Sequence, residues 1–110
     1  MEEPEVRIAR TESLFRNVNE RIAESSQRIE SEDTAFVCEC SDADCTERVE
    51  ATLGVYEDVR SDGTQFLLAP GHEDERVERV VDERPRYSIV RKVNQIVAAH
   101  VRRLNPRAAA

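Results

Sequence analysis

The sequence FVCECSDADC, residues 36–45, contains all three cysteines of this 110-residue chain, and a Pro-Gly-His segment follows at residues 70–72. In an extended segment Cys38 and Cys40 point to the same side, because alternate side chains share one face of a strand. The Asp-rich residues after Cys40 favour a turn that returns Cys45 to the same place. Zinc takes four ligands in a tetrahedron, and the rigid Pro-Gly turn can present a histidine as the fourth. We therefore predict a structural Zn²⁺ site made by Cys38, Cys40, Cys45 and His72.

Other uses of the same side chains stay open. The thiols could serve in redox sensing, two of them could pair in a disulfide, or the cluster could hold another metal or an iron–sulfur centre. His100 is the rival for the fourth ligand position, and Cys45 with His72 could act as nucleophile and base. Acidic neighbours such as Glu39 disfavour thiolates in the absence of metal, which argues against reactive thiols. A closed ligand set leaves no open position for a substrate, so we favour a structural role over an enzyme.

The composition indicates that the fold needs a stabilising cross-link. Aromatic residues make up 5% of the chain, Trp is absent, and charged residues reach 35%. In a domain below about 70–80 residues, a hydrophobic core rarely supplies more than about 3–5 kcal/mol. A structural zinc ion contributes about 10–16 kcal/mol of apparent binding free energy, which becomes folding free energy. The weak core and the thiol cluster therefore explain each other.

The sequence also favours a cytoplasmic location. No apolar run of 18 residues is present, so no membrane span is expected. The acidic residues 1–5 lack the basic start and apolar stretch of a signal peptide. Lys92 is the only lysine among sixteen basic residues, a bias towards arginine that is typical of GC-rich bacterial genomes. In a bacterial cytoplasm thiols stay reduced, and clustered cysteines favour a metal over a disulfide.

Residues 6–30 are predicted to form a helix. An apolar side chain recurs there every seven residues, at Ile8, Phe15, Ile22 and Ile29. This narrow stripe indicates either a helix that packs on its own core or one that pairs with another helix, because a seven-residue period is close to that of a coiled-coil seam. The polar residues 31–34 are expected to end the helix as a linker.

Residues 35–92 are predicted to form the zinc-stabilised core. Alternating apolar residues indicate short strands at residues 35–37 and 49–53. Thr52 can cap a short helix over residues 53–60. Further strands are expected at residues 66–69 and 87–90, and residues 77–81 fit either a strand or a helical turn.

Residues 93–104 predict a second long helix. One face is expected to hold Val93, Ile96, Val97, Val101 and Leu104. From Tyr87 onward the chain carries five bases and no acid, whereas its net charge is −7. This helix could contact nucleic acid or an acidic protein groove. We favour packing on the acidic body of its own domain, with Arg side chains in ion pairs at the rim.

These elements define an α+β fold with a small three- or four-stranded antiparallel sheet around the zinc site. The expected division is an N-terminal amphipathic helix and linker (1–34), the zinc-stabilised core (35–92), and a basic C-terminal helix with a frayed tail (93–110).

The spacing CxCx4C at residues 38–45, with Pro-Gly-His at 70–72 and a Tyr-x-x-Val-x-Lys pattern at 87–92, resembles a group of small uncharacterised actinobacterial proteins. The resemblance covers roughly residues 10–92 and implies a single module, but it carries no activity. The CxC pair is also similar to the SWIM zinc finger, although the CxH half of that finger is replaced here by Cys45-Thr46-Glu47.

The sequence therefore predicts a non-catalytic, zinc-stabilised protein-interaction module of the bacterial cytoplasm. We expect it to bind a protein partner and not to contact a membrane. Thiol-based redox or metal sensing by the same cysteines is the alternative. Nucleic-acid contact through the basic C-terminal helix is a second alternative.

Overall fold

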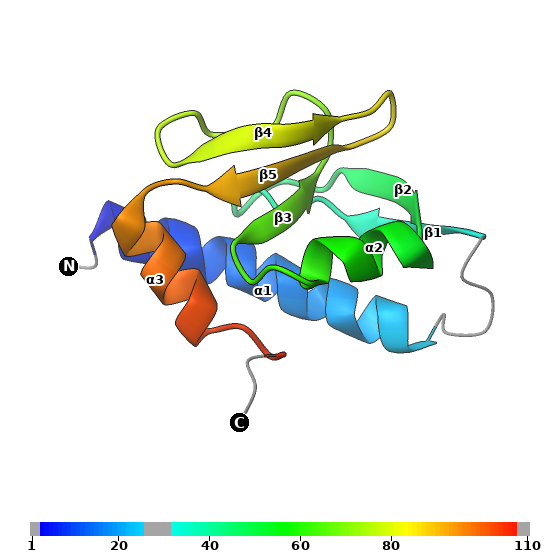
Figure 1. The fold of residues 1–110 in the computed structure, drawn as a ribbon, viewed down its shortest axis with the longest axis horizontal. Coiled ribbons are helices and arrows are strands. Elements are labelled where there is room, and N and C mark those ends of the chain that lie inside the picture. The colour runs from blue at the N-terminus through cyan, green and yellow to red at the C-terminus, as the bar shows by residue number, and fades with distance from the viewer. Residues whose placement is uncertain (1–2, 26–31, 108–110) are drawn as a thin grey trace.

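In the computed structural model, which describes residues 3–25 and 32–107, helices and strands alternate along the chain (Figure 1). In chain order they are α1 (Pro4–Ser25), β1 (Asp33–Val37), β2 (Arg48–Thr52), α2 (Leu53–Arg60), β3 (Gln65–Leu68), β4 (Glu78–Glu83), β5 (Ser88–Lys92) and α3 (Gln95–Arg103). The strands form two antiparallel sheets, a β1–β2 pair and a three-stranded sheet in the order β3-β5-β4. The α+β class is confirmed, with the strands divided between two small sheets.

Strands β1 and β2 form the hairpin that carries the cysteine segment. Phe36 lies opposite Val49 in the register, and both side chains are fully buried. The Phe36 ring stacks on Tyr56 of α2, with ring centroids 4.6 Å apart. β1 begins at Asp33, so this strand starts inside the segment expected to be a linker. The hairpin is thus fixed to the core through one aromatic pair.

The end of β2 leads directly into α2, as the sequence predicts. The Thr52 side chain accepts a hydrogen bond from the Val55 backbone N–H, at 3.1 Å. This bond satisfies one of the N–H groups that the first turn of a helix leaves unpaired.

Replacing Thr52 with Ala is expected to lower the free energy of unfolding by about 1 kcal/mol, because the capping acceptor is lost. Urea denaturation of the metal-loaded protein measures this change. Thr52→Ser keeps the hydroxyl and is the matched control, which should lie within a few tenths of a kcal/mol of the wild type. Equal losses in both variants would show that the cap contributes little.

The three-stranded sheet has β5 at its centre. Residues 78–83 form strand β4, which decides between the two interpretations that the sequence allowed there. The register between β4 and β5 shifts between Val80 and Asp82, which marks a β-bulge. Val80 and Val81 are exposed on this edge strand.

Helix α1 buries a polar face, which differs from the apolar stripe expected to face the core. Its fully buried positions are Ala9, Glu12, Ser13, Arg16, Asn19 and Ala23. Ile8 and Ile22 of the seven-residue stripe are only partly buried at the margin of the core. Ile29 and the expected helix end at residue 30 lie outside the described residues. The expected stripe therefore flanks the buried face and does not form it.

Arg16 and Asn19 of this face meet partners that are remote in sequence. Arg16 donates to the backbone carbonyls of Gly63 and Val101, at 2.9 and 2.7 Å. Asn19 donates to the Val37 carbonyl and accepts from the Val37 N–H, both at 2.8 Å. Because buried polar groups are costly unless they are hydrogen-bonded, these contacts explain why a polar helix face can be buried.

A buried group of three charges joins α1 to the three-stranded sheet. Lys92 of β5 forms ion pairs with Glu12 of α1 and Glu78 of β4, and all three side chains are fully buried. The Lys92 ammonium lies 4.9 Å from the centre of the Phe66 ring. Burial raises the pKa of Glu12 to about 8, although Lys92 acts in the opposite direction and Glu78 adds to the rise. The interior thus holds two carboxyl groups around the Lys92 side chain.

Helix α3 begins at a capped position and buries less than the sequence indicates. The Asn94 side chain accepts hydrogen bonds from the Ile96 and Val97 N–H groups, both at 3.0 Å. Val97, Ala98 and Val101 are buried. The prediction was wrong for three members of the expected apolar face, because Val93, Ile96 and Leu104 are exposed.

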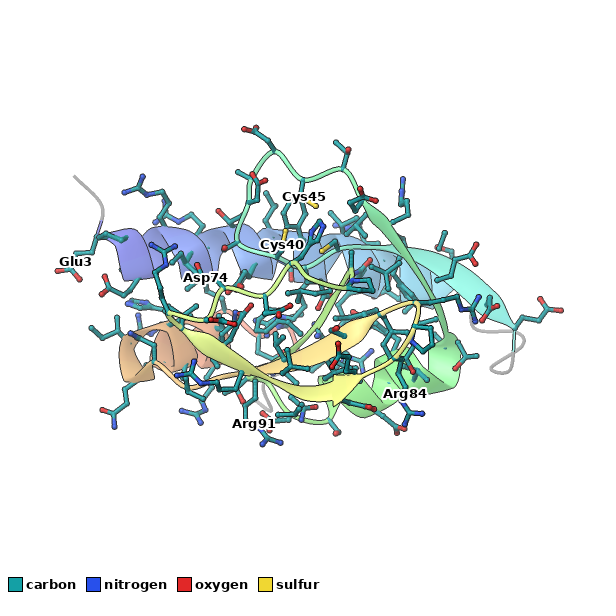
Figure 2. All side chains as sticks on the ribbon, turned by 90° about the horizontal axis from the view of Figure 1, so that it is seen from above. Glu3, Cys40, Cys45, Asp74, Arg84 and Arg91 are labelled. Atoms are coloured by element: carbon teal, nitrogen blue, oxygen red, sulfur yellow. The ribbon has the colours of Figure 1, made fainter. Side chains whose placement is uncertain are left out.

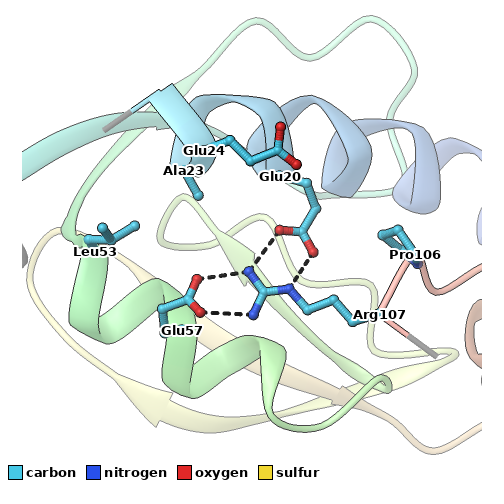
Figure 3. A pocket seen from close by; sticks show the side chains of 7 residues that line it. All are labelled: Glu20, Ala23, Glu24, Leu53, Glu57, Pro106 and Arg107. Carbon is cyan, nitrogen blue, oxygen red and sulfur yellow. Dashed lines mark hydrogen bonds and ion pairs between the residues drawn. The ribbon is translucent and has the colours of Figure 1, made fainter. Parts of the chain in front are cut away.

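The segment after α3 folds back onto the acidic body. The Arg107 guanidinium makes paired hydrogen bonds to Glu20 of α1 and to Glu57 of α2, at 2.6 to 2.9 Å (Figure 3). These residues line a pocket of about 520 Å³ together with Ala23, Glu24, Leu53 and Pro106. The expected frayed tail is corrected at Arg107, because two carboxylates of the domain hold its side chain.

Candidate metal centre

The segment that holds the first two cysteines lies between the two sheets. The Cys38 N–H donates to the Glu47 carbonyl at 3.1 Å, which continues the β1–β2 hairpin. The next residue turns to the other sheet, because the Glu39 N–H donates to the Leu67 carbonyl of β3 at 2.9 Å. Cys38 and Cys40 are therefore held by backbone contacts with both sheets.

A tight turn returns the third cysteine, as the Asp-rich sequence predicts. The Asp42 side chain accepts from the Asp44 N–H at 2.9 Å, and the Asp42 carbonyl accepts from the Cys45 N–H at 3.0 Å. Such self-bonding by an Asp side chain is what makes Asp common in turns. Cys40 and Cys45 lie at the two ends of this loop (Figure 2).

The histidine is supplied by the loop between β3 and β4. The His72 N–H donates to the Ala69 carbonyl at 3.2 Å, which closes a four-residue turn over 69–72. Gly71 has a φ of 82°, and this sign together with the preceding Pro70 is typical of a type II turn. Only glycine adopts that φ without strain, so the Pro-Gly pair fixes where the imidazole begins.

The four side chains converge on one point. The ligand atoms of Cys38, Cys40, Cys45 and His72 all lie within 4.8 Å of one another. The His72 Nδ1 atom lies 3.5 Å from the sulfur of Cys38 and 3.6 Å from that of Cys45. A tetrahedral ion with zinc–sulfur bonds of about 2.3 Å and zinc–nitrogen bonds of about 2.0–2.1 Å requires a sulfur–nitrogen separation of about 3.5–3.6 Å. The observed spacing fits such an ion.

Ordinary hydrogen bonding does not account for this spacing. A neutral imidazole nitrogen has either one hydrogen to donate or one lone pair to accept with. His72 Nδ1 faces the sulfurs of Cys38 and Cys45 at nearly equal distances, so this nitrogen can form a full hydrogen bond with only one of them. A cation between the four side chains satisfies all of them at once. The arrangement can therefore hold a metal ion through three sulfurs and one nitrogen.

The thiols affect one another's ionisation. Hydrogen bonding with Cys38 lowers the pKa of Cys40 to about 5, and the same interaction together with burial raises the pKa of Cys38. Burial also raises the pKa of Cys45. The Ala69 N–H donates to the Cys38 sulfur at 3.2 Å, a contact that favours negative charge on that sulfur.

Glu39 differs in role from the expectation that it opposes thiolates. Its fully buried carboxylate points away from its two cysteine neighbours, and it accepts from Asn19 at 2.7 Å and from Arg60 and the Leu67 N–H at 2.9 Å. The Arg60 guanidinium neutralises its charge. Glu39 therefore ties α1, α2 and β3 to the backbone that carries the thiols. The alternation of side chains along Cys-Glu-Cys could have indicated that Glu39 lies on the face opposite to the cysteines, but it does not identify the three partners of Glu39.

The structure brings together all four residues predicted from the sequence. His100, the rival ligand, lies on α3, where its ring contacts Arg103 at 3.3 Å, and it does not belong to the cluster. Cys45 and His72 are adjacent, as a nucleophile and base would be, but the same atoms complete the metal-ligand set.

Fold and site together define a small α+β protein with a candidate metal centre of three cysteines and one histidine. No protein-family model matches the sequence, and neither a curated protein nor a solved structure matches it significantly. Among the described residues, no helix combines the length and the apolar character that crossing a membrane requires.

Proposed function

We propose that the protein is a non-catalytic protein-interaction module whose fold is held by one structural Zn²⁺ ion bound to Cys38, Cys40, Cys45 and His72. The observation that carries the proposal is the convergence of three sulfurs and one imidazole within 4.8 Å of one another, with two sulfur–nitrogen separations that fit a tetrahedral site. Three thiolates and one imidazole fill the coordination of zinc, so no position is left for water or substrate. This ligand set is typical of structural rather than catalytic zinc.

The position of the site supports a structural role. Three ligands belong to the β1–β2 hairpin and its loop, whereas His72 belongs to the loop after β3. An isolated two-stranded hairpin is marginally stable in water. An ion at this point joins the hairpin to the three-stranded sheet, so its binding free energy stabilises the whole domain.

Protein purified from cells without added metal tests the proposal. Elemental analysis by mass spectrometry is expected to find one zinc ion per chain. Cobalt substitution should give the visible absorption of a tetrahedral thiolate site. In His72→Ala this visible absorption should weaken, while the absorption that arises from the cobalt–sulfur bonds should remain. Protein that contains no transition metal, or iron with sulfide, would refute the zinc site.

Redox sensing by the same thiols is the second candidate, favoured by one difference within the cluster. Cys45 is partly exposed, whereas Cys38 and Cys40 are buried, so an oxidant reaches Cys45 first. Hydrogen peroxide would convert two thiolates into a disulfide and release two hydroxide ions, and the zinc ion would leave. Rapid zinc release at low peroxide, followed with a chromogenic chelator, would favour the sensor, and resistance would favour the structural role.

A further inference from the structure

A groove between α1 and α3 is a candidate binding surface outside the metal centre. A pocket of about 230 Å³ lies between the two helices and is lined by Val6, Arg10, His100, Arg103 and Leu104. Pockets for complete small-molecule ligands hold about 300–1,000 Å³. This volume is therefore suited to one or two side chains of a protein partner.

Exposed apolar side chains extend the groove along both helices. Leu14 follows Arg10 by one helical turn on α1, and Ile96 precedes His100 by one turn on α3. Leu14 is 62% exposed, and Ile96 and Leu104 are each 45% exposed. Large apolar side chains left in solvent on neighbouring helices are typical of an interaction surface.

The charge of the groove is opposite to that of the molecule. The two charged residues that line the pocket are arginines, and the remaining polar residue is a histidine. The chain as a whole has a net charge of −7. Among the residues that the structure describes, no carboxylate lines this pocket.

We infer that this groove between α1 and α3 binds an acidic amphipathic helix of another protein. The inference rests on the proposed function as an interaction module and specifies the chemistry of its partner. An amphipathic helix fits a groove between two helices because its ridge of side chains enters the space between them. An apolar side chain of the partner fills the pocket between Val6 and Leu104, and a flanking Asp or Glu residue pairs with Arg103.

A nucleic-acid ligand fits the same surface less well. A phosphate backbone carries a charge at every nucleotide, so the acidic body next to the groove repels it more strongly than a helix with a few acidic residues. Leu14, Ile96 and Leu104 offer phosphates no favourable contact, whereas they match the apolar face of a helix.

The test uses the intact, zinc-loaded protein labelled with ¹⁵N. The probe is a synthetic acidic amphipathic helix of Leu, Ala and Glu with apolar residues at helical spacing, and the control peptide has the same composition in scrambled order. Added probe is expected to shift the amide signals of Val6, Arg10, Leu14, His100 and Leu104, and the scrambled peptide is not. Arg103→Glu should weaken probe binding about tenfold, because a favourable charge pair becomes a repulsive one.

Arg84→Glu is the matched control, because it makes the same charge change at the exposed turn between β4 and β5. It should leave probe binding unchanged. Leu104→Ser, which keeps the charge, should also weaken binding severalfold. Each variant is first checked for one bound zinc ion and an unchanged unfolding transition, so that loss of the metal site is separated from loss of the groove.

Several outcomes would overturn the inference. They are no shifts with the probe at millimolar concentration, equal shifts with the scrambled peptide, or shifts that cluster away from α1 and α3. Groove shifts produced by a DNA oligonucleotide and not by the probe would assign the surface to nucleic acid. A dimer detected by ultracentrifugation and abolished by Leu104→Ser would assign it to a second copy of the chain.

Discussion

A Cys40→Ser protein is expected to lose its bound ion and, with it, the cooperative unfolding of the whole domain. A serine hydroxyl is a poor replacement for a thiolate, because zinc binds sulfur as a charged ligand at about 2.3 Å. Structural zinc contributes about 10–16 kcal/mol of apparent binding free energy, which exceeds the total stability of many domains, about 5–15 kcal/mol. The loss should therefore be visible as unfolding and not only as a lower midpoint.

Near- and far-UV circular dichroism during thermal and urea denaturation measures this outcome, with zinc content determined on the same samples. Wild-type protein treated with a strong chelator should behave like the variant, and added zinc should restore only the wild type. Asp44→Ser is the matched control, because it changes an exposed side chain of the same loop while leaving every ligand in place. If metal-free protein and metal-loaded protein unfold equally sharply at the same midpoint, the ion does not hold the fold.

The metal cluster could be predicted from the sequence because its determinants are local. The spacing of Cys38 and Cys40, the Asp turn before Cys45 and the Pro-Gly turn before His72 each fix a direction within a few residues. The two loops could be assigned to one site because zinc needs a fourth ligand and His72 can supply it. The same locality explains why the cap at Thr52 could be predicted.

The orientation of α1 could not be predicted, because its partners are remote. Arg16 can be buried because it donates a hydrogen bond to the Val101 carbonyl, 85 positions away. Glu12 can be buried because it forms an ion pair with Lys92, 80 positions away. In the sequence alone these residues look like the solvent-facing side of an amphipathic helix. Only the tertiary structure shows that Lys92 of β5 compensates Glu12 and that two backbone carbonyls accept from Arg16. The periodicity therefore predicts a buried apolar stripe, whereas the structure buries the polar residues of α1.

The exposure of α3 has a related cause. The interior beneath this helix is already occupied by the buried side chains of α1 and β5, so only Val97, Ala98 and Val101 find room. Ile96 and Leu104 are left at the edge next to α1. A periodic pattern predicts that these residues share one side of a helix, but it does not predict how wide a strip the rest of the protein covers.

The second large effect is expected at Lys92, whose replacement by Met should lower the free energy of unfolding by about 3–5 kcal/mol. Met keeps the volume and removes the charge, so Glu12 and Glu78 are left buried without a cation. Removing one partner of a buried ion pair costs about this much, because the remaining charge stays desolvated. Urea denaturation of the zinc-loaded proteins measures the loss.

The matched rescue is the Glu12→Gln/Lys92→Met double variant. It removes one of the two buried carboxyl groups that have lost their cation, and it should recover part of the lost stability if the cost of burying these groups without Lys92 is the cause. Equal instability of the single and double variants would indicate lost packing against Phe66 instead.

The cost of Lys92→Met should depend on pH, and its direction follows from Glu12. Burial holds the pKa of Glu12 near 8, above its ordinary value of 4.5, so between these values the folded protein binds more protons than the unfolded chain. Stability contributed by this carboxyl is therefore complete below pH 4.5 and declines as pH rises towards 8. Removing Lys92 deletes the one attraction that opposes this rise, so the decline becomes larger and extends to higher pH. The difference between wild type and variant that comes from Glu12 should thus stay about constant between pH 5.5 and pH 7 and widen as the pH passes about 8, and a difference that does not widen there would contradict the charge-based explanation.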